Sequence, residues 1–270
     1  MTKNNLDFMY RRIFKPGDNP ERVKQKVCQD IFISKLTTNK DLVDKVVFKG
    51  GVVMYELTSG KRGYTKDIDL DFIKHSIEPE GITNFINQLN QSRIYDNITI
   101  QIISTKPLNQ EDYHGTRVEL EFDDITTTFT LFVDIGVYLD KVSIPDKIDY
   151  ELKLSSNTVE IPIDSNNLSI YEKMSTFAKF STDNERVHDL FDLYWRLRYM
   201  DYDIKKVLLI LDQRLVYSGY FKRREIIKQR LIDTFTDGDY LKEIELEDNW
   251  TGVRVEKIVA YIVEFVNTNF

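Results

Sequence analysis

The stretch KGGVVMYELTSGKRGYTKDIDLDF, residues 49–72, joins two adjacent glycines to a segment that is acidic at every second position. The acids run from Asp67 to Asp71, and apolar residues stand between them. Because successive side chains of a strand point to opposite faces, this pattern predicts a strand with one apolar and one acidic face. Carboxylates this close together repel one another and resist burial unless they are paired or bound to a metal. We therefore expect a compensating group beside the acidic face.

The two glycines, Gly50 and Gly51, follow a short apolar run and precede a segment that is typical of a helix ending at Gly60. The predicted order is strand, Gly-Gly turn, helix, loop and acidic strand. Such a turn lets backbone N–H groups and the helix N-terminus approach an anion, which favours a phosphate.

A third acid, Asp134, stands in the apolar segment TFTLFVDIGVY, residues 128–138. We expect this segment to be an interior strand beside the acidic one, where an isolated aspartate would be costly. Together with Asp67 and Asp69 it could ligate one or two hard divalent cations, for which Mg²⁺ is the natural candidate. Two such cations beside bound phosphates would stabilise displacement at phosphorus, which is the chemistry of nucleotidyl transfer.

Three other interpretations compete with this one. An EF-hand loop needs a glycine at its sixth position, where Phe72 stands. A Walker-type phosphate loop needs Gly-Lys-Ser or Gly-Lys-Thr after the glycines, and neither occurs there. In the third, the glycines only make a tight turn and the aspartates lie exposed on an edge strand, where charge deters aggregation. The combination of the glycines, the acidic strand and Asp134 favours the phosphate and metal site.

The chain has 270 residues, of which 41% are hydrophobic and 30% charged, as in ordinary globular proteins. Segments with strand-like periodicity fill the first half, and helical patterns dominate from about residue 169. We predict an α+β fold in which residues 1–165 form a mixed β-sheet with flanking helices. Residues 166–270 should form a C-terminal helical bundle.

The net charge of −7 gives no global electrostatic reason to expect nucleic-acid binding, although it leaves room for a local basic patch. The sequence has no apolar run long enough to span a membrane, and its first residues lack the apolar core of a signal peptide. We expect a cytoplasmic protein with no membrane partner.

Several motifs occur together in a recognisable order: FKGG, KDIDLDF, FVDI, YEKMSTFAKF and RVHDLFDLYW. The glycine and aspartate motifs resemble those of the nucleotidyltransferase superfamily. The full set, over about residues 20 to 200, resembles the AbiEii family, the toxins of type IV toxin-antitoxin and abortive-infection systems. The resemblance implies a nucleotidyltransferase-type sheet, a nucleoside triphosphate substrate and a toxin neutralised by a separately encoded antitoxin.

The resemblance also assigns roles to residues of the first half. The segment from Lys49 to Gly51 would hold the triphosphate. Asp67 and Asp69 would bind magnesium, and Asp134 would complete the metal site or accept the proton of an attacking hydroxyl.

In the second half, the resemblance implies that Lys173 contacts phosphate. Asp189, and less clearly Asp192, match an acidic element on a later helix, and Arg186 precedes them by one turn as a further nucleotide contact. From the residues alone, ordinary salt bridges along a helix explain these charges equally well.

The acceptor of the nucleotide is left open. Related toxins make the hydroxyl of a tRNA end one candidate. The alternatives are a small molecule, as for antibiotic-modifying nucleotidyltransferases, or a catalytically silent module that binds a nucleotide or a protein partner.

Overall fold

The structure is a computed structural model that describes residues 5–110, 113–138, 145–183 and 188–270. The chain divides into two compact units, Met1–Asp164 and Ser165–Phe270. The first unit combines a β-sheet with helices and the second is helical, so the predicted α+β fold class is confirmed.

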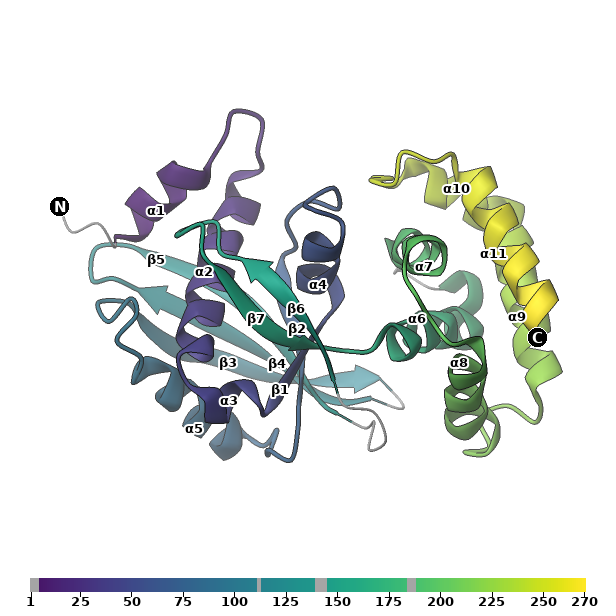
Figure 1. Cartoon of the computed structure of the whole chain (residues 1–270), viewed down its shortest axis with the longest axis horizontal. Coiled ribbons are helices and arrows are strands. Elements are labelled where there is room, and N and C mark those ends of the chain that lie inside the picture. Colours follow the sequence, from purple (N-terminus) through teal and green to yellow (C-terminus); the bar gives the residue numbers. More distant parts are fainter. Residues whose placement is uncertain (1–4, 111–112, 139–144, 184–187) are drawn as a thin grey trace. The chain divides into compact units, whose positions relative to one another are not determined.

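The first unit contains a seven-stranded mixed sheet with the order β3-β4-β5-β2-β1-β7-β6 (Figure 1). Its strands are β1 (Val46–Lys49), β2 (Asp67–Phe72), β3 (Thr99–Gln110), β4 (Tyr113–Asp123), β5 (Thr128–Val137), β6 (Asp146–Glu151) and β7 (Thr158–Ile163). The acidic strand β2 lies between β5, to which it is parallel, and β1, to which it is antiparallel. The interpretation of the aspartates as residues of an edge strand is therefore wrong.

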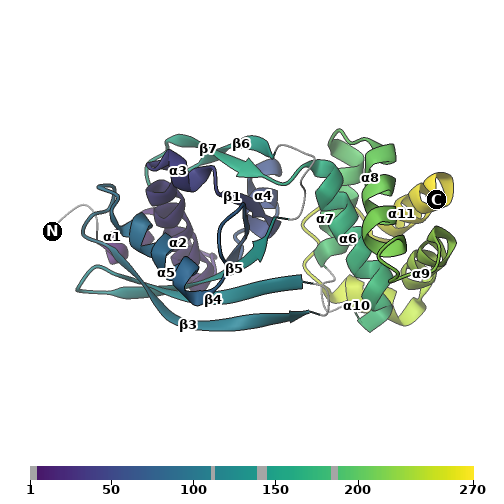
Figure 2. The same cartoon turned by 90° about the horizontal axis from the view of Figure 1, so that it is seen from below.

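The first unit also contains helices that share its core with the sheet: α1 (Leu6–Ile13), α2 (Pro20–Thr37), α3 (Lys40–Val43), α4 (Gly50–Leu57) and α5 (Pro79–Asn90). Helix α2 begins at Pro20, because the Asn19 side chain accepts hydrogen bonds from backbone N–H groups of the first turn and proline occupies its first position. It crosses one face of the sheet and contacts β5, β7 and β2 (Figure 1). Helix α5 lies beside α2 and packs on β3 (Figure 2).

The apolar face of β2 forms part of the core. Ile68, Leu70 and Phe72 are fully buried, in one cluster with Val27 and Ile31 of α2. Burying these side chains contributes roughly 1.5–3 kcal/mol each, before the loss of conformational entropy is counted. The aspartates between them must then face the other side of the sheet, which fixes the orientation of the candidate site.

The second unit consists of α6 (Asn166–Phe180), α7 (His188–Tyr199), α8 (Ile204–Leu211), α9 (Arg224–Thr236), α10 (Gly238–Leu246) and α11 (Val255–Asn269). A 3₁₀ turn, Ser181–Asp183, follows α6, and a π-helical turn, Asp212–Val216, continues α8. Helix α6 packs against α7, α8 and α9, with the rings of Phe177 and Phe235 4.9 Å apart between centroids. Over the part of the chain that the structure describes, no helix combines the length and apolar character needed to cross a membrane.

Candidate active site

The register of the sheet places the three predicted metal ligands on one face. Asp69 of β2 is the direct partner of Asp134 in the parallel strand β5, and Asp67 lies two residues before Asp69. The predicted adjacency of the two strands is thus confirmed. The side chains of Asp67 and Asp134 are 27% and 13% exposed, so both are accessible to a small cation and neither is fully hydrated.

The turn between β1 and α4 brings backbone close to this acidic face. Gly50 has φ +60°, a left-handed conformation that favours glycine, and a Cβ at this position would overlap the carboxylate of Asp69. A Cβ on Gly51 would lie 2.6 Å from the Cβ of Thr65. Both glycines are therefore required for close packing between the start of α4 and the acidic strand.

The N-cap residue of α4, Lys49, makes no capping hydrogen bond with its side chain. The first N–H groups of a helix have no partner within it, and the positive end of its dipole favours an anion. This helix end, beside Asp69, is where the sequence predicts the triphosphate. Such an anion would need a cation to balance the neighbouring carboxylate.

A buried glutamine fixes the start of β2. The Gln29 side chain, 2% exposed, donates hydrogen bonds of 3.2 Å to the backbone carbonyls of both Thr65 and Asp67. The Thr65 hydroxyl in turn donates to the Asp67 carboxylate at 3.0 Å. Asp67 is thereby held by α2 and by the residue that packs on Gly51, so its position is set by the fold.

Arg117 of β4 is the compensating group for part of the acidic face, and the sequence analysis did not identify it. Its Nε and Nη2 each donate to one oxygen of Asp134, both at 2.7 Å, and Nη2 lies 3.8 Å from Asp67. Arg117 and Asp134 are direct partners in adjacent antiparallel strands. These hydrogen bonds raise the pKa of the Arg117 guanidinium, so it is positively charged at all relevant pH values.

A second charged group adjoins the site. Lys49, which the sequence assigned to the nucleotide, forms an ion pair of 3.1 Å with Asp71. Asp71 is 4% exposed, and the carboxylate of Asp164, 1% exposed, approaches it to within 4.8 Å. Asp164 directly follows β7, the strand parallel to β1, and its N–H donates to the carbonyl of Phe48. Sequence analysis missed Asp164 because nothing in its local pattern places it beside β1.

The donor set of the acidic face fits a hard divalent cation. Carboxylate oxygens are the ligands that Mg²⁺ prefers, and Asp67, Asp69 and Asp134 supply them from two adjacent strands. The guanidinium of Arg117 places one positive charge beside Asp67 and Asp134, which compensates part of the negative charge of this face.

The second unit brings together another group of predicted residues. The ammonium of Lys173 on α6 lies 2.7 Å from Asp189 and 3.2 Å from Asp192, both on α7. Burial lowers the pKa of Lys173, but the two carboxylates outweigh this effect and leave its pKa raised. Lys173 is therefore charged at neutral pH. Arg186 lies outside the described residues.

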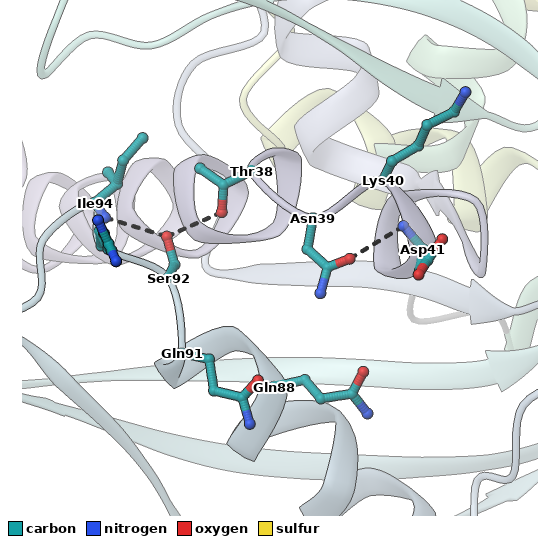
Figure 3. A pocket seen from close by; sticks show the side chains of 9 residues that line it. Thr38, Asn39, Lys40, Asp41, Gln88, Gln91, Ser92 and Ile94 are labelled. Atoms are coloured by element: carbon teal, nitrogen blue, oxygen red, sulfur yellow. Dashed lines mark hydrogen bonds between the residues drawn. The ribbon is translucent and has the colours of Figure 1, made fainter.

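A polar hollow of about 540 Å³ lies elsewhere in the first unit, beside α2, α3 and α5 (Figure 3). Its lining carries mainly amide and hydroxyl side chains, among them Asn39, Gln88 and Gln91, with Lys40 and Arg93 as cationic members. None of the predicted site residues lines it. We assign it no part in the chemistry of the acidic face.

Two solved structures from Helicobacter pylori are similar to this chain. One, a candidate nucleotidyltransferase, is 17% identical, with 89% of this chain and 92% of that chain covered and a TM-score of 0.49. The other, JHP933, is 16% identical, with 93% and 92% covered and a TM-score of 0.50. At this identity the similarity to JHP933 shows a shared fold. No curated protein sequence matches the chain.

A family model described as the nucleotidyl transferase AbiEii toxin of a type IV toxin-antitoxin system matches residues 34–255. The matched range contains the glycine turn, the acidic strand, Asp134 and the Lys173 cluster. The resemblance seen in the sequence motifs is thereby confirmed, as is the expectation of a nucleotidyltransferase. The chain belongs to the AbiEii family of nucleotidyltransferase toxins.

Proposed function

We propose that this protein transfers a nucleotide from a nucleoside triphosphate to an acceptor hydroxyl and releases pyrophosphate, with Mg²⁺ as its cofactor. One observation carries the proposal. The sheet register sets Asp69 directly beside Asp134, with Asp67 on the same face and the Gly50 turn packed against Asp69. Carboxylates that could hold a cation therefore adjoin a helix N-terminus that could hold phosphate.

In this proposal, Asp67, Asp69 and Asp134 hold the metal. A bound Mg²⁺ would neutralise charge on the phosphate oxygens and activate the attacking hydroxyl. The protein's own contribution is rigidity, because the Gln29 and Thr65 hydrogen bonds fix Asp67 before any ligand binds. Prearranged ligands of this kind lower the reorganisation needed in the transition state.

We assign the triphosphate to the N-terminus of α4, at Gly50 and Gly51. Lys49, the residue before these glycines, occupies the N-cap position of α4. Its ion pair with Asp71 holds the side chain ready, and a phosphate would offer it a second negative partner.

For the second unit, we propose that Lys173 contributes to triphosphate binding, with Asp189 and Asp192 as positioning residues. The two carboxylates hold its ammonium in one place and keep it charged. Asp192 is buried, with 1% of its side chain exposed, so it is suited to hold the Lys173 ammonium in place. Asp189 is 20% exposed and could give up its contact with Lys173 when a ligand binds. Arg186 remains a proposed nucleotide contact.

We further propose a tRNA end as the acceptor, the cytoplasm as the place of action and a cognate antitoxin as the partner that counters toxicity. The family's toxin-antitoxin context supports the last of these. The nucleotide base is left to experiment.

The test is to incubate the protein with Mg²⁺ and each α-labelled nucleoside triphosphate, offering total tRNA, a protein extract or a metabolite extract. Asp69→Asn removes a proposed ligand, and Asp149→Asn, on an exposed position of β6, is the matched control. We expect label in tRNA with the wild type and the control but not with Asp69→Asn. Equal labelling by all three proteins would refute the site. Label confined to metabolites would favour a small-molecule acceptor, and nucleotide binding without transfer would favour a silent module.

A further inference from the structure

The polar face around the proposed metal site has an unusual charge arrangement. Asp67, Asp69 and Asp134 contribute three carboxylates, and Arg117 contributes one guanidinium that contacts two of them. Without a cation, these four groups carry a net charge of about −2 if all are ionised at pH 7. Arg117 is therefore a compensating charge that the protein itself supplies to Asp134.

The geometry of the Arg117 contact matters for metal binding. The guanidinium donates to both oxygens of Asp134, in the two-pronged arrangement that gives the strongest and most directional arginine–carboxylate pairs. A divalent cation that takes an oxygen of Asp134 would sit close to this guanidinium, and the two positive charges would repel each other. Metal and Arg117 are thus alternative partners for the same carboxylate.

Arg117 has a second favourable contact besides Asp134. Its side chain is 43% exposed, and its guanidinium lies 5.7 Å from the ring centre of Phe132, which is itself 38% exposed on the same face of β5. This contact exists while the guanidinium holds Asp134, and it would remain favourable after the guanidinium has left its carboxylate. The release of Asp134 would then need only a rotation of an exposed side chain, with no movement of the sheet.

Resting on the metal-dependent transfer proposed above, we propose that Arg117 is a resident counter-cation that competes with the divalent metal for Asp134. In the metal-free protein it stabilises the acidic face. When metal binds, it yields Asp134 and keeps its contact with Phe132. Arg117 therefore sets the metal concentration at which the third carboxylate becomes a ligand, and it acts as a positioning residue rather than a catalytic one.

This competition predicts opposite effects of Arg117 on the metal-free and the metal-bound protein. Arg117→Gln removes the competing charge, so the metal-free variant should unfold at a lower temperature than the wild type. The same variant should bind Mn²⁺, a spectroscopic substitute for Mg²⁺, roughly two- to fivefold more tightly, which is the effect expected from losing one partly exposed charge pair. Arg117→Lys keeps the charge but cannot donate to both oxygens of Asp134 in the same way. Its affinity for Mn²⁺ should therefore lie between those of the wild type and Arg117→Gln.

The experiment measures free Mn²⁺ by electron paramagnetic resonance and the thermal midpoint by circular dichroism, each with and without Mn²⁺. Arg224→Gln is the matched control, because Arg224 makes a similar two-pronged pair with a single carboxylate, Asp212, on the second unit. We expect Mn²⁺ to raise the thermal midpoint of Arg117→Gln more than that of the wild type. The increase for Arg224→Gln should equal the increase for the wild type.

The two proposals fail differently. Equal Mn²⁺ affinity in the wild type and Arg117→Gln would overturn the competition and leave the metal site standing. Weaker Mn²⁺ binding by Arg117→Gln would overturn it as well, since Arg117 would then support the bound metal. If Mn²⁺ binds neither protein, the metal site itself is wrong and the competition falls with it. If Arg117→Gln does not fold, the comparison of Arg117→Lys with the wild type decides the matter, because only competition makes the lysine variant bind Mn²⁺ more tightly.

Discussion

Asp69 of β2 and Asp134 of β5 are direct partners in adjacent parallel strands, on the face of the sheet that looks away from the core. Their neighbours in sequence, Leu70 and Val133, are buried on the opposite face. A slip of one residue in either strand would exchange the two faces and place a carboxylate in the core. The apolar residues that stabilise the sheet therefore also determine where the candidate metal ligands lie.

Asp69→Ala should abolish nucleotide transfer and leave the free energy of unfolding unchanged or slightly higher. Arg117 contacts Asp67 and Asp134, and Asp69 adds a third carboxylate to this face, so removing Asp69 relieves repulsion. Urea denaturation followed by circular dichroism gives the free energy, and label transfer gives the activity. A loss of more than about 1 kcal/mol would show that Asp69 is needed by the fold, because a simple surface change costs less.

Gly50→Ala should destabilise the protein and impair transfer, since a methyl group there meets the carboxylate of Asp69. Gly63→Ala is the matched control. Gly63 also has a positive φ, +77°, but a Cβ there would meet nothing within 4 Å. Both changes carry the strain of a left-handed alanine, roughly 1–2 kcal/mol. We expect Gly50→Ala to lose more stability than Gly63→Ala, and only Gly50→Ala to lose transfer activity. Equal losses of stability, with transfer retained in both variants, would contradict the close approach of Gly50 to Asp69.

The acidic strand was predictable because its alternation is strict, and β5 was predictable because its run of apolar residues is long. Strand β6 was not predicted, and the reason is its place at the edge of the sheet. Of its six residues only Tyr150 is buried, so the segment shows no clear hydrophobic alternation. Its partner β7, which lies next to β1 in the sheet, was not predicted either.

The partners within the site were harder to predict than its acids. Alternation places Arg117 on the polar face of β4, but which residue it meets depends on the register between β4 and β5, which local patterns do not contain. The ion pair of Lys49 with Asp71 similarly depends on the pairing of β1 with β2. Sequence reasoning thus found the residue types that the chemistry needs, and the strand pairing decided which charges compensate them.

Lys173→Met should lower the free energy of unfolding by roughly 3–5 kcal/mol, the range for breaking a buried ion pair on one side. The change removes the ammonium that lies 3.2 Å from the buried carboxylate of Asp192. Lys173→Met combined with Asp192→Asn should recover part of that loss, because the buried negative charge is then removed as well. Nucleotide affinity, measured by calorimetry below the unfolding transition of each variant, should be reduced in both. Unchanged affinity in the folded variants would remove Lys173 from the nucleotide site.

Asp124 offers a test of stability that is independent of catalysis. One of its oxygens accepts a hydrogen bond of 2.6 Å from the N–H of Leu6, at the start of α1, and the other accepts from Thr126 and from the N–H of Thr127. Burial raises the pKa of Asp124, but these hydrogen bonds outweigh it and leave the pKa lowered. Its contribution to stability is therefore fully present above the unfolded pKa of about 3.9 and is lost as the pH falls through the lower, folded pKa.

Asp124→Asn should accordingly lower the free energy of unfolding by roughly 1–3 kcal/mol at pH 7, because the new amide group turns a donor towards a backbone N–H that needs an acceptor. The difference between wild type and variant should begin to shrink as the pH falls below about 4, where the carboxyl of the unfolded chain takes up a proton, and its charge-dependent part should be lost only below the lower pKa of the folded protein. Urea denaturation at a series of pH values measures this difference, with the exposed Asp149→Asn as control. A difference that stays constant from pH 7 to pH 2.5 would mean that the charge of Asp124 does not hold α1 to the β4–β5 turn.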